Sequence, residues 1–317
     1  MKTFKSILQF AKEFDTDAKC RLYLEEQRWG GTPACHHCGS INVCRFANNS
    51  GVFKCREKQC RKKFTVTCGT VYQDRKLPLT KIFLAVYVLG THSKGISSLQ
   101  LANLLDISQK TAWLLNHKVR AMLKEGEKEL LNGEIELDET FIGGKDSNKH
   151  KGKRTGKTPS KSLITTGISL YKKDTKTPVF GILQRSGIVR AFKVDNVKVK
   201  TLLPIMVDNV TKDSSIFTDE YVGYQKLNEQ GFKHESVSHV KLEYVRGNAH
   251  TQGIENFWSI LKRQINGIHH FVSPKHLQRY CDEAAFRYNN RAKAQDERFA
   301  IALTQVNGSL QWKELVS

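Results

Sequence analysis

Residues 134–142 read EIELDETFI, and this stretch decides the fold class of the chain. Apolar and polar side chains alternate along it, with the period of two that is typical of a β-strand with one buried face. Further strands are predicted at residues 162–171, 177–185 and 191–194, followed by a helix at 199–208 and a strand that begins at 214. Strands followed by helices, with one strand-helix crossover, predict an α/β fold in which helices cover a mixed sheet.

Helical periodicity precedes this region, from Leu77 to about Lys128. It predicts a short helix at residues 98–105, a turn at 106–108, and a second helix through Val119 with Ser108 as its N-cap. The apolar side chains expected on the inner face are Leu101, Leu104, Ile107, Ala112, Leu115 and Val119. This spacing is typical of a helix-turn-helix. The side chains expected to reach DNA from the second helix are Gln109, Lys110, Asn116 and Arg120.

Two cysteine pairs, in the motifs CHHC and CREKQC, are separated by a β-rich stretch. Four thiolates satisfy the tetrahedral coordination of Zn²⁺ and leave no open position for catalysis, so the pattern predicts a structural zinc site. The predicted ligands are Cys35, Cys38, Cys55 and Cys60. Replacement of one cysteine by His36 or His37 is the alternative, and Cys44 and Cys68 are expected to be small buried residues.

The 51 Lys and Arg residues outnumber the 31 Asp and Glu residues, which gives a formal net charge of 51 − 31 = +20. Cations that neutralise phosphates release counterions, so this charge favours a polyanionic partner such as nucleic acid. Cations beside the cysteine motifs and in the Gly/Lys-rich segment 150–161 are interpreted as phosphate contacts, with a solvated basic surface as the alternative. The residues assigned in this way are Arg56, Lys62, Lys63, Lys153 and Arg154.

The N-terminal stretch MKTFKSILQFAKEF reads as a short amphipathic helix without a signal-peptide cleavage site. The longest apolar run, Ile82 to Leu89, is far shorter than the roughly 20 residues that a membrane-spanning helix needs. These observations predict a soluble cytoplasmic protein without a membrane partner.

Three carboxylates stand where an isolated acid would be costly to bury. Asp138 lies mid-strand, Asp219 ends the strand that begins at 214, and Glu255 enters a helical pattern. Each alone is explained by a turn cap, a salt bridge or a helical charge pair with Lys262. Together they predict convergence on two Mg²⁺ or Mn²⁺ ions, which prefer oxygen ligands and promote phosphodiester chemistry.

The helix predicted around Glu255 carries an apolar stripe that indicates a buried face. The stripe consists of Ile254, Phe257, Trp258, Leu261 and Ile265. Trp258 is therefore interpreted as core packing and not as a base-stacking group. Lys262 shares a separate polar row with Glu255, where it can meet a phosphate, and Arg263 is assigned to DNA contact.

Several long motifs resemble one known family, the insertion-sequence DDE transposases with an N-terminal zinc ribbon and an RNase H-like, integrase-type catalytic domain. The motifs that carry the resemblance are YLEEQRWGG, CHHCGS, CREKQCRKKFTVTCGTVYQDRKLPL, GISSLQLANLLDISQKTAW, LDETFIGGK, FTDEYVGY, EYVRGNAHTQGIENFWSILKR and FVSPKHLQRYCDEAAFRYNNR. They cover nearly the whole chain. The resemblance implies that Asp138, Asp219 and Glu255 form the acidic triad, with Lys262 as the associated basic residue.

The chain departs from the family pattern at two positions, Cys68 in TCGT and Gln252 in HTQ. His250 is the alternative to Glu255 as third ligand. The neighbouring acids Glu139 and Glu220 are the second choices for the first two positions.

The resemblance implies a metal-dependent DNA strand transferase. Hydrolysis at the element end would expose a 3′-OH, which then attacks target DNA in line. The ribbon and helix-turn-helix would bind terminal inverted repeats of double-stranded DNA, and a homodimer or larger assembly would join two ends to one target. A bacterial or archaeal, nucleoid-associated protein is expected.

The predicted domains are an N-terminal helix with a zinc ribbon at 1–75, a helix-turn-helix at 76–128, and an RNase H-like catalytic domain at 129–317. Two alternatives remain for the function. One is a DNA-binding regulator with an inactive catalytic domain, and the other is an RNase H-like nuclease without strand transfer.

Overall fold

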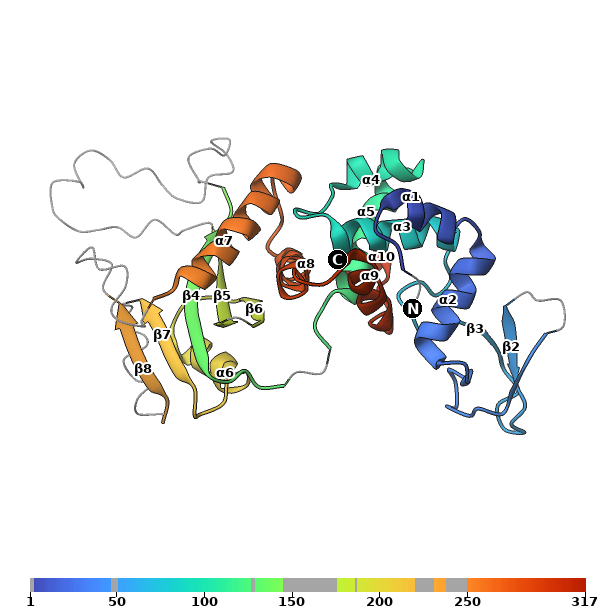
Figure 1. Cartoon of the computed structure of the whole chain (residues 1–317), viewed down its shortest axis with the longest axis horizontal. Helices are drawn as coiled ribbons and strands as arrows, with labels where there is room; N and C mark the ends of the chain where they lie inside the picture. The colour runs from blue at the N-terminus through green and yellow to red at the C-terminus, as the bar shows by residue number, and fades with distance from the viewer. Residues whose placement is uncertain are drawn as a thin grey trace. The chain divides into compact units, whose positions relative to one another are not determined.

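The computed structural model describes residues 3–46, 51–126, 129–144, 176–185, 187–219, 231–237 and 250–317, without the side chains of Asp219, Ser236 and Val237. The chain forms two compact units, which Figure 1 colours by residue number. Unit 1 comprises Met1–Glu127 and Asp282–Ser317, and unit 2 comprises Lys128–Cys281. The sequence interpretation assigned all of 129–317 to one domain, whereas the segment from Asp282 onward packs within unit 1.

Unit 1 is mainly helical and is built around an aromatic cluster. Its helices are α1 Ile7–Glu13, α2 Asp17–Trp29, α3 Leu79–Thr91, α4 Ser98–Leu105, α5 Gln109–Met122, α9 Gln295–Thr304 and α10 Trp312–Val316. The ring of Phe299 in α9 lies 5.7 Å from that of Phe4 and 5.2 Å from that of Phe10, both edge to face. Such aromatic pairs stabilise a core beyond their buried area. This packing explains why the C-terminal helices belong to unit 1.

The two helices predicted for the helix-turn-helix are present, with α4 at the expected bounds. Ser108 is the N-cap of α5 and accepts a hydrogen bond from the Thr111 backbone N–H at 3.2 Å. Asp106 ends α4 in the left-handed conformation, with φ of 49°. The inner face is buried as predicted except at Ile107, which is partly buried, and at Leu104, which is 46% exposed.

Three short antiparallel strands form the cysteine-rich part of unit 1, in the order β1-β2-β3. They are β1 Val43–Arg45, β2 Val52–Cys55 and β3 Lys63–Thr65. Trp29, at the end of α2, packs edge to face against Phe53 and Phe64, at 5.2 and 6.1 Å between ring centroids. The small sheet therefore rests on a helix and has only a few apolar side chains of its own.

Unit 2 contains a five-stranded mixed sheet in the order β6-β5-β4-β7-β8. Its strands are β4 Glu134–Ile142, β5 Thr177–Gln184, β6 Val189–Lys193, β7 Ser215–Asp219 and β8 Lys233–Val237. Only β5 runs antiparallel to the others, because β4 pairs in parallel with β7 and β7 in parallel with β8. The strand predicted at 162–171 lies outside the described residues.

The helices of unit 2 are α6 Val199–Val207 and α7 Gln252–Gln264, which continues as a π-helical turn at Ile265–His269. A further helix, α8 Leu277–Asn289, crosses the boundary between the two units. The mixed sheet covered by helices that the sequence predicts is confirmed. Among the described residues, no helix is long and apolar enough to cross a membrane.

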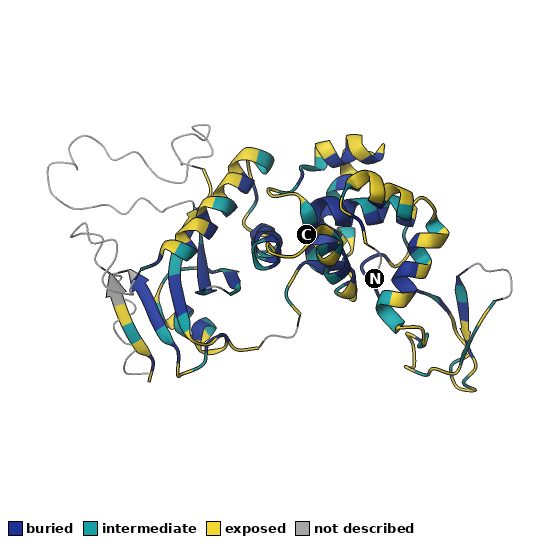
Figure 2. Cartoon of the chain, viewed as in Figure 1, coloured by how far each residue is buried: buried dark blue, intermediate teal, exposed yellow. Residues whose placement is uncertain are grey.

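The two faces of β4 have opposite character, as its alternation predicts. On one face Ile135 and Leu137 form a core with Leu202 and Met206 of α6. The other face carries Glu136 and Asp138 and is covered by α7, which contacts both β4 and β5. Figure 2 shows exposed and buried segments along α7, as expected for a helix with one face on a sheet. Helix α7 thus covers the face of the sheet that carries Glu136 and Asp138.

Candidate functional site

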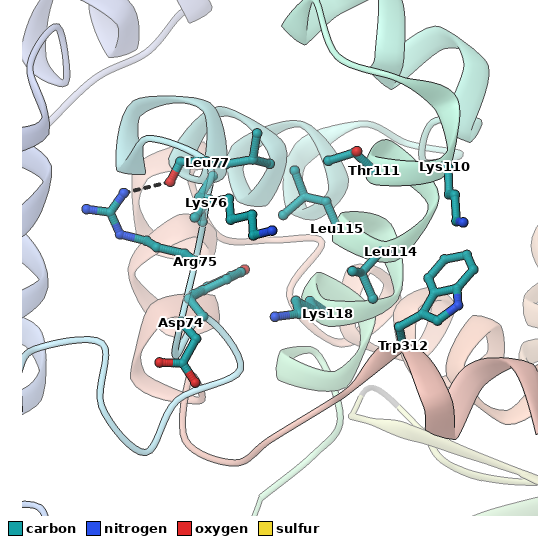
Figure 3. A pocket seen from close by; sticks show the side chains of 12 residues that line it. Asp74, Arg75, Lys76, Leu77, Lys110, Thr111, Leu114, Leu115, Lys118 and Trp312 are labelled. Atoms are coloured by element: carbon teal, nitrogen blue, oxygen red, sulfur yellow. Dashed lines mark hydrogen bonds between the residues drawn. The ribbon is translucent and has the colours of Figure 1, made fainter.

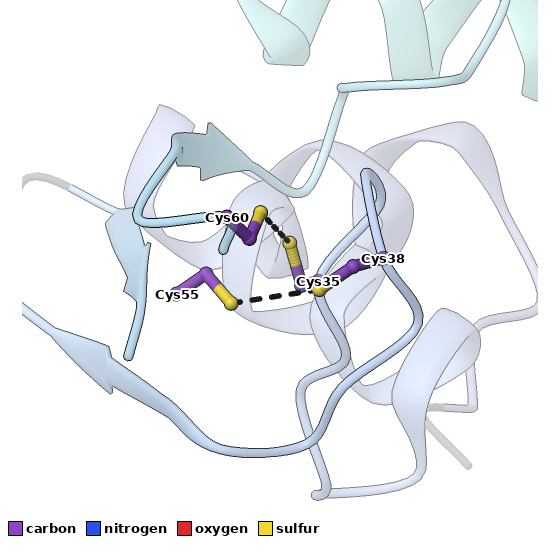
Figure 4. A group of neighbouring side chains, drawn as sticks. All are labelled: Cys35, Cys38, Cys55 and Cys60. Carbon is purple, nitrogen blue, oxygen red and sulfur yellow. Dashed lines mark hydrogen bonds between the residues drawn. The ribbon is translucent and has the colours of Figure 1, made fainter. Parts of the chain in front are cut away.

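The four predicted zinc ligands are brought together in the ribbon. Figure 4 shows their side chains converging, two from the turn at 35–38, one from the end of β2 and one from the following turn. All four Sγ atoms lie within 4.8 Å of one another, with 3.8 Å between Cys35 and Cys60 and 3.6 Å between Cys38 and Cys55. Four sulfurs at about 2.3 Å from a tetrahedral centre are about 3.8 Å apart, so the cluster fits Zn²⁺.

Burial, together with the neighbouring thiols, raises the pKa of the Cys55 thiol to about 12. Clustered thiolates repel one another, so a cation is needed to hold four of them together. Cys44 and Cys68 lie outside the cluster and are partly exposed, so the expectation that they are buried is wrong. Neither His36 nor His37 belongs to the cluster, which leaves the four-cysteine set.

A basic surface lies beside the zinc cluster. Arg56, Lys62 and Lys63 are exposed, as the phosphate-contact interpretation requires. Arg56 and Lys62 also line a groove with Lys58 and His37, next to the two cysteine turns. The predicted contacts Lys153 and Arg154 lie outside the described residues.

Of the four side chains of α5 that were predicted to contact DNA, two are exposed and two are buried. Gln109 and Lys110 are exposed in its first turn. Asn116 and Arg120 are each only 1% exposed, so their assignment to DNA contact is wrong for the folded protein. The Nε atom of Arg120 lies 2.6 Å from Oε2 of Glu283, where the pair is closed off from solvent. The reason is that α5 packs on more than one neighbour, which widens its buried face beyond the single apolar stripe.

A pocket of about 520 Å³ adjoins the exposed side of α5 (Figure 3). Its lining combines an apolar floor with cations, and it includes Trp312 of α10. The Nζ atom of Lys110 lies 4.7 Å from the centre of the Trp312 ring, within the range of a cation–π contact. Burial lowers the pKa of Lys118, which is partly opposed by the charge of Asp74. This part of unit 1 presents positive charge beside the predicted recognition helix.

The three predicted carboxylates belong to adjacent elements of unit 2. Asp138 lies in β4, and its Oδ2 atom accepts a hydrogen bond from Nε1 of Trp258 in α7 at 2.9 Å. Glu255 is exposed one helical turn before Trp258, and its Oε1 atom accepts a hydrogen bond from the Thr251 hydroxyl at 3.1 Å. Asp219 ends β7, the parallel neighbour of β4, and its side chain lies outside the description.

Continued by two residues, the pairing of Glu136 with Phe217 would set Asp138 level with Asp219. Glu139 occupies the opposite face of β4 from Asp138, because successive side chains of a strand alternate. Glu220, the second choice for Asp219, lies outside the described residues. The strand geometry thus favours Asp138 over Glu139 as the candidate metal ligand from β4.

A buried acid two residues before Asp138 was not recognised from the sequence. Glu136 is 1% exposed and accepts hydrogen bonds from Nε of Arg185 and from the Ile254 backbone N–H, both at 2.9 Å. His250, the alternative third ligand, lies 3.4 Å from the same carboxylate. A Cβ atom placed on Gly253 would lie 2.9 Å from Oε2 of Glu136, so glycine permits this close approach. The contact holds the start of α7 against β4.

The alternation of EIELDETFI contained one signal for the contact between Glu136 and α7, since it places Glu136 on the same face of the strand as Asp138. Its partners come from distant parts of the chain, which sequence spacing does not bring together. Arg185 follows β5, and its guanidinium lies 4.1 Å above the ring of Phe217.

Trp258 is packed as predicted, with 3% of its surface exposed, and it also has a polar partner that the sequence interpretation did not foresee. Lys262 and Arg263 are exposed near the end of α7. Arg263 donates a hydrogen bond from Nε to the Ser259 carbonyl at 3.1 Å. Its side chain therefore lies along the exposed surface of the helix.

Two solved structures show likeness to the chain at low scores. One is the simian T-cell lymphotropic virus intasome in complex with PP2A regulatory subunit B56 gamma, at 14% identity and a TM-score of 0.24, covering 72% of this chain and 68% of that chain. The other is a pre-cleavage Mos1 transpososome, at 12% identity and a TM-score of 0.26, covering 72% and 80%.

Two curated proteins are similar in sequence. An uncharacterized protein in transposable element ISH50 of Halobacterium salinarum is 27% identical over 278 residues, which cover 85% of this chain and 90% of that protein. An uncharacterized transposase-like protein of Haemophilus influenzae is 35% identical over 122 residues, which cover 37% of this chain and 92% of that protein.

Two family models match two separate stretches of the chain. The transposase zinc-ribbon domain matches residues 15–63, and the ISXO2-like transposase domain matches residues 130–289. The sheet order β6-β5-β4-β7-β8, with β5 alone antiparallel, is that of the RNase H-like fold, so the predicted fold class is confirmed. The chain belongs to the insertion-sequence transposases that combine an N-terminal zinc ribbon with an ISXO2-like transposase domain.

Proposed function

We propose that this transposase binds the terminal inverted repeats of its insertion sequence and catalyses metal-dependent DNA cleavage and strand transfer. One observation carries the proposal. The helix that bears Glu255 is fastened by two hydrogen bonds to the strand that bears Asp138, and Asp219 ends the adjacent parallel strand. Asp138, Asp219 and Glu255 thus belong to three neighbouring elements, which supports a shared metal site.

Asp138, Asp219 and Glu255 are the residues that would hold divalent cations. Their oxygen-only chemistry fits Mg²⁺ or Mn²⁺, which bind through a few carboxylates together with substrate phosphates. When two such ions are bound, they supply activation of the attacking hydroxyl and stabilisation of the leaving oxygen. Lys262, exposed two turns beyond Glu255 on α7, would contact a phosphate that flanks the reacting one.

Unit 1 would hold the element end. The ribbon, folded by Zn²⁺, offers Arg56, Lys62 and Lys63 to phosphates, and the first turn of α5 offers Gln109 and Lys110 to a groove. Arg263 of unit 2, together with Lys153 and Arg154, would add contacts to the sugar-phosphate backbone of the DNA. Assembly of two or more copies on DNA would bring two ends to one target, because joining both ends requires two active sites.

The test uses zinc-loaded full-length protein, a labelled terminal-repeat duplex, a plasmid target and Mg²⁺. We expect cleaved and joined products with the wild type and neither product with Asp219→Asn. Asp208→Asn, which alters an exposed acid after α6 in the same unit, is the matched control and should retain both products.

Each other outcome contradicts the proposal in a different way. Nicked duplex that is never joined would indicate a nuclease without strand transfer. Binding without any cleavage would indicate a DNA-binding regulator.

A further inference from the structure

The indole of Trp258 makes one polar contact that packing alone does not require. Its Nε1 atom donates to Oδ2 of Asp138 at 2.9 Å, and the Glu139 backbone N–H donates to Oδ1 of the same carboxylate at 2.8 Å. Trp258 is 3% exposed, so the N–H group needs an acceptor within the protein. Two donors on two different oxygens fix the plane of the Asp138 carboxylate.

Gly181 sets the height of the indole above the sheet. It lies in β5 directly across from Asp138, and a Cβ atom placed there would come within 2.5 Å of Cζ2 and 2.6 Å of Cη2 of Trp258. Any larger residue at this position would push the indole away from the strand. The absent side chain is therefore what allows the N–H group to reach Asp138.

The second fastening of α7 lies one turn earlier, where the Ile254 N–H meets buried Glu136. The two contacts leave α7 little freedom to slide or rotate over β4. Glu255 lies between them in the sequence of the helix, so its position relative to Asp138 is set by both.

We propose that Trp258 is a positioning residue that holds the Asp138 carboxylate in the orientation needed to bind a divalent cation. The inference rests on the proposed function, in which Asp138 is a metal ligand. Partners that orient ligand carboxylates commonly change metal affinity or activity by about 10–100-fold when they are removed. The competing explanation is that Trp258 only fills space on Gly181.

Trp258→Phe separates these explanations, because phenylalanine keeps an aromatic ring on the sheet and lacks the N–H donor. The readout is Mn²⁺ binding to the zinc-loaded full-length protein without DNA, measured by calorimetry, with thermal unfolding as the check on folding. We expect Mn²⁺ affinity to fall by about tenfold or more while the variant remains folded. Unchanged affinity would overturn the inference.

Gly181→Ala is an independent variant, since it moves the indole without altering either hydrogen-bonding partner. It should weaken Mn²⁺ binding and also lower the unfolding temperature. In the double variant Trp258→Phe with Gly181→Ala, the smaller ring lacks the two indole atoms that collide with a Cβ at 181, and the contact with Cδ1 of Ile254 at 2.8 Å remains. We expect the double variant to recover part of the lost stability without recovering Mn²⁺ affinity. Recovery of both would show that Trp258 acts through packing alone.

An Asp138→Asn variant separates failure of this inference from failure of the proposed function. If the wild type and Asp138→Asn bind Mn²⁺ equally, the metal site itself is wrong. If only Asp138→Asn loses binding and Trp258→Phe does not, the metal site stands and the positioning role of Trp258 is wrong.

Discussion

At the scale of single residues, Glu136 shows how the polar face of β4 is made compatible with burial. A carboxylate that is 1% exposed would be strongly destabilising without partners. Arg185 supplies the opposite charge, and the free N–H group at the start of α7 supplies a second donor. The positive end of the helix dipole also favours an acid at this place.

Glu136→Ala should lower the free energy of unfolding by about 3–5 kcal/mol, because it leaves the charge of Arg185 without its buried partner. The measurement is denaturant-induced unfolding followed by circular dichroism. Glu134→Gln is the matched control, since Glu134 pairs with the same arginine at 3.3 Å but its side chain is 43% exposed. The control should cost less than about 1 kcal/mol, and equal losses in the two variants would contradict the account.

At the scale of elements, α5 shows what the sequence predicts well and what it does not. Its start at Ser108 follows from a local capping signal, which was confirmed. The burial of Asn116 and Arg120 depends on helices far away in the sequence, including the one that carries Glu283, so a single amphipathic stripe could not reveal it. The exposed surface of α5 that could contact DNA is consequently narrower than predicted.

In unit 2 as well, local patterns were predicted correctly and contacts between distant residues were not. The alternation in β4 and the apolar stripe in α7 were sufficient to predict a strand, a helix and a buried Trp258. Strand β8 was missed because its sequence, KHESV, is mostly polar and gives no strand signal. The contacts of Glu136 with Arg185 and of Trp258 with Asp138 join residues about 50 and 120 positions apart, and such distant partners leave no periodic pattern.

Two cations of α5 should respond differently to substitution. Lys110→Ala is expected to weaken DNA binding and to reduce the slope of log affinity against log salt by about one, with unfolding unchanged. Arg120→Ala should instead destabilise the fold by about 1.5–3 kcal/mol, because buried Glu283 loses one of its two arginine partners and keeps Arg287. Salt-dependent binding isotherms and thermal unfolding of both variants provide the check. A stable Arg120→Ala protein with a reduced salt slope would reverse the assignment.

The ribbon should depend on its metal for folding. Its apolar core is small, so four thiolates bound to Zn²⁺ are expected to supply much of its stability. We predict one zinc ion per chain by elemental analysis, and loss of that ion in Cys60→Ser. Cys44→Ser is the matched control, because Cys44 lies in β1 outside the cluster. Zinc loss in the control, or zinc retained in Cys60→Ser, would contradict the four-cysteine site.

At the scale of the whole molecule, the two roles in the proposed function fall on two different units. Unit 1 contains the ribbon, α4 and α5, and unit 2 contains the sheet with the candidate carboxylates. The net charge of +20 suits the proposal that both units contact DNA. The order of motifs along the chain predicted three domains, whereas the structure has two compact units and residues 282–317 belong to unit 1.

The most direct test of the central claim supplies the reaction with DNA ends that are already cut and carry a free 3′-OH. Wild-type protein with Mg²⁺ should join these ends to a plasmid target, because cleavage is no longer needed. Asp138→Asn, Asp219→Asn and Glu255→Gln should each abolish joining while still binding the ends, since one set of three carboxylates is proposed to serve both steps. Joining at the wild-type rate by any one of these three variants would contradict the account.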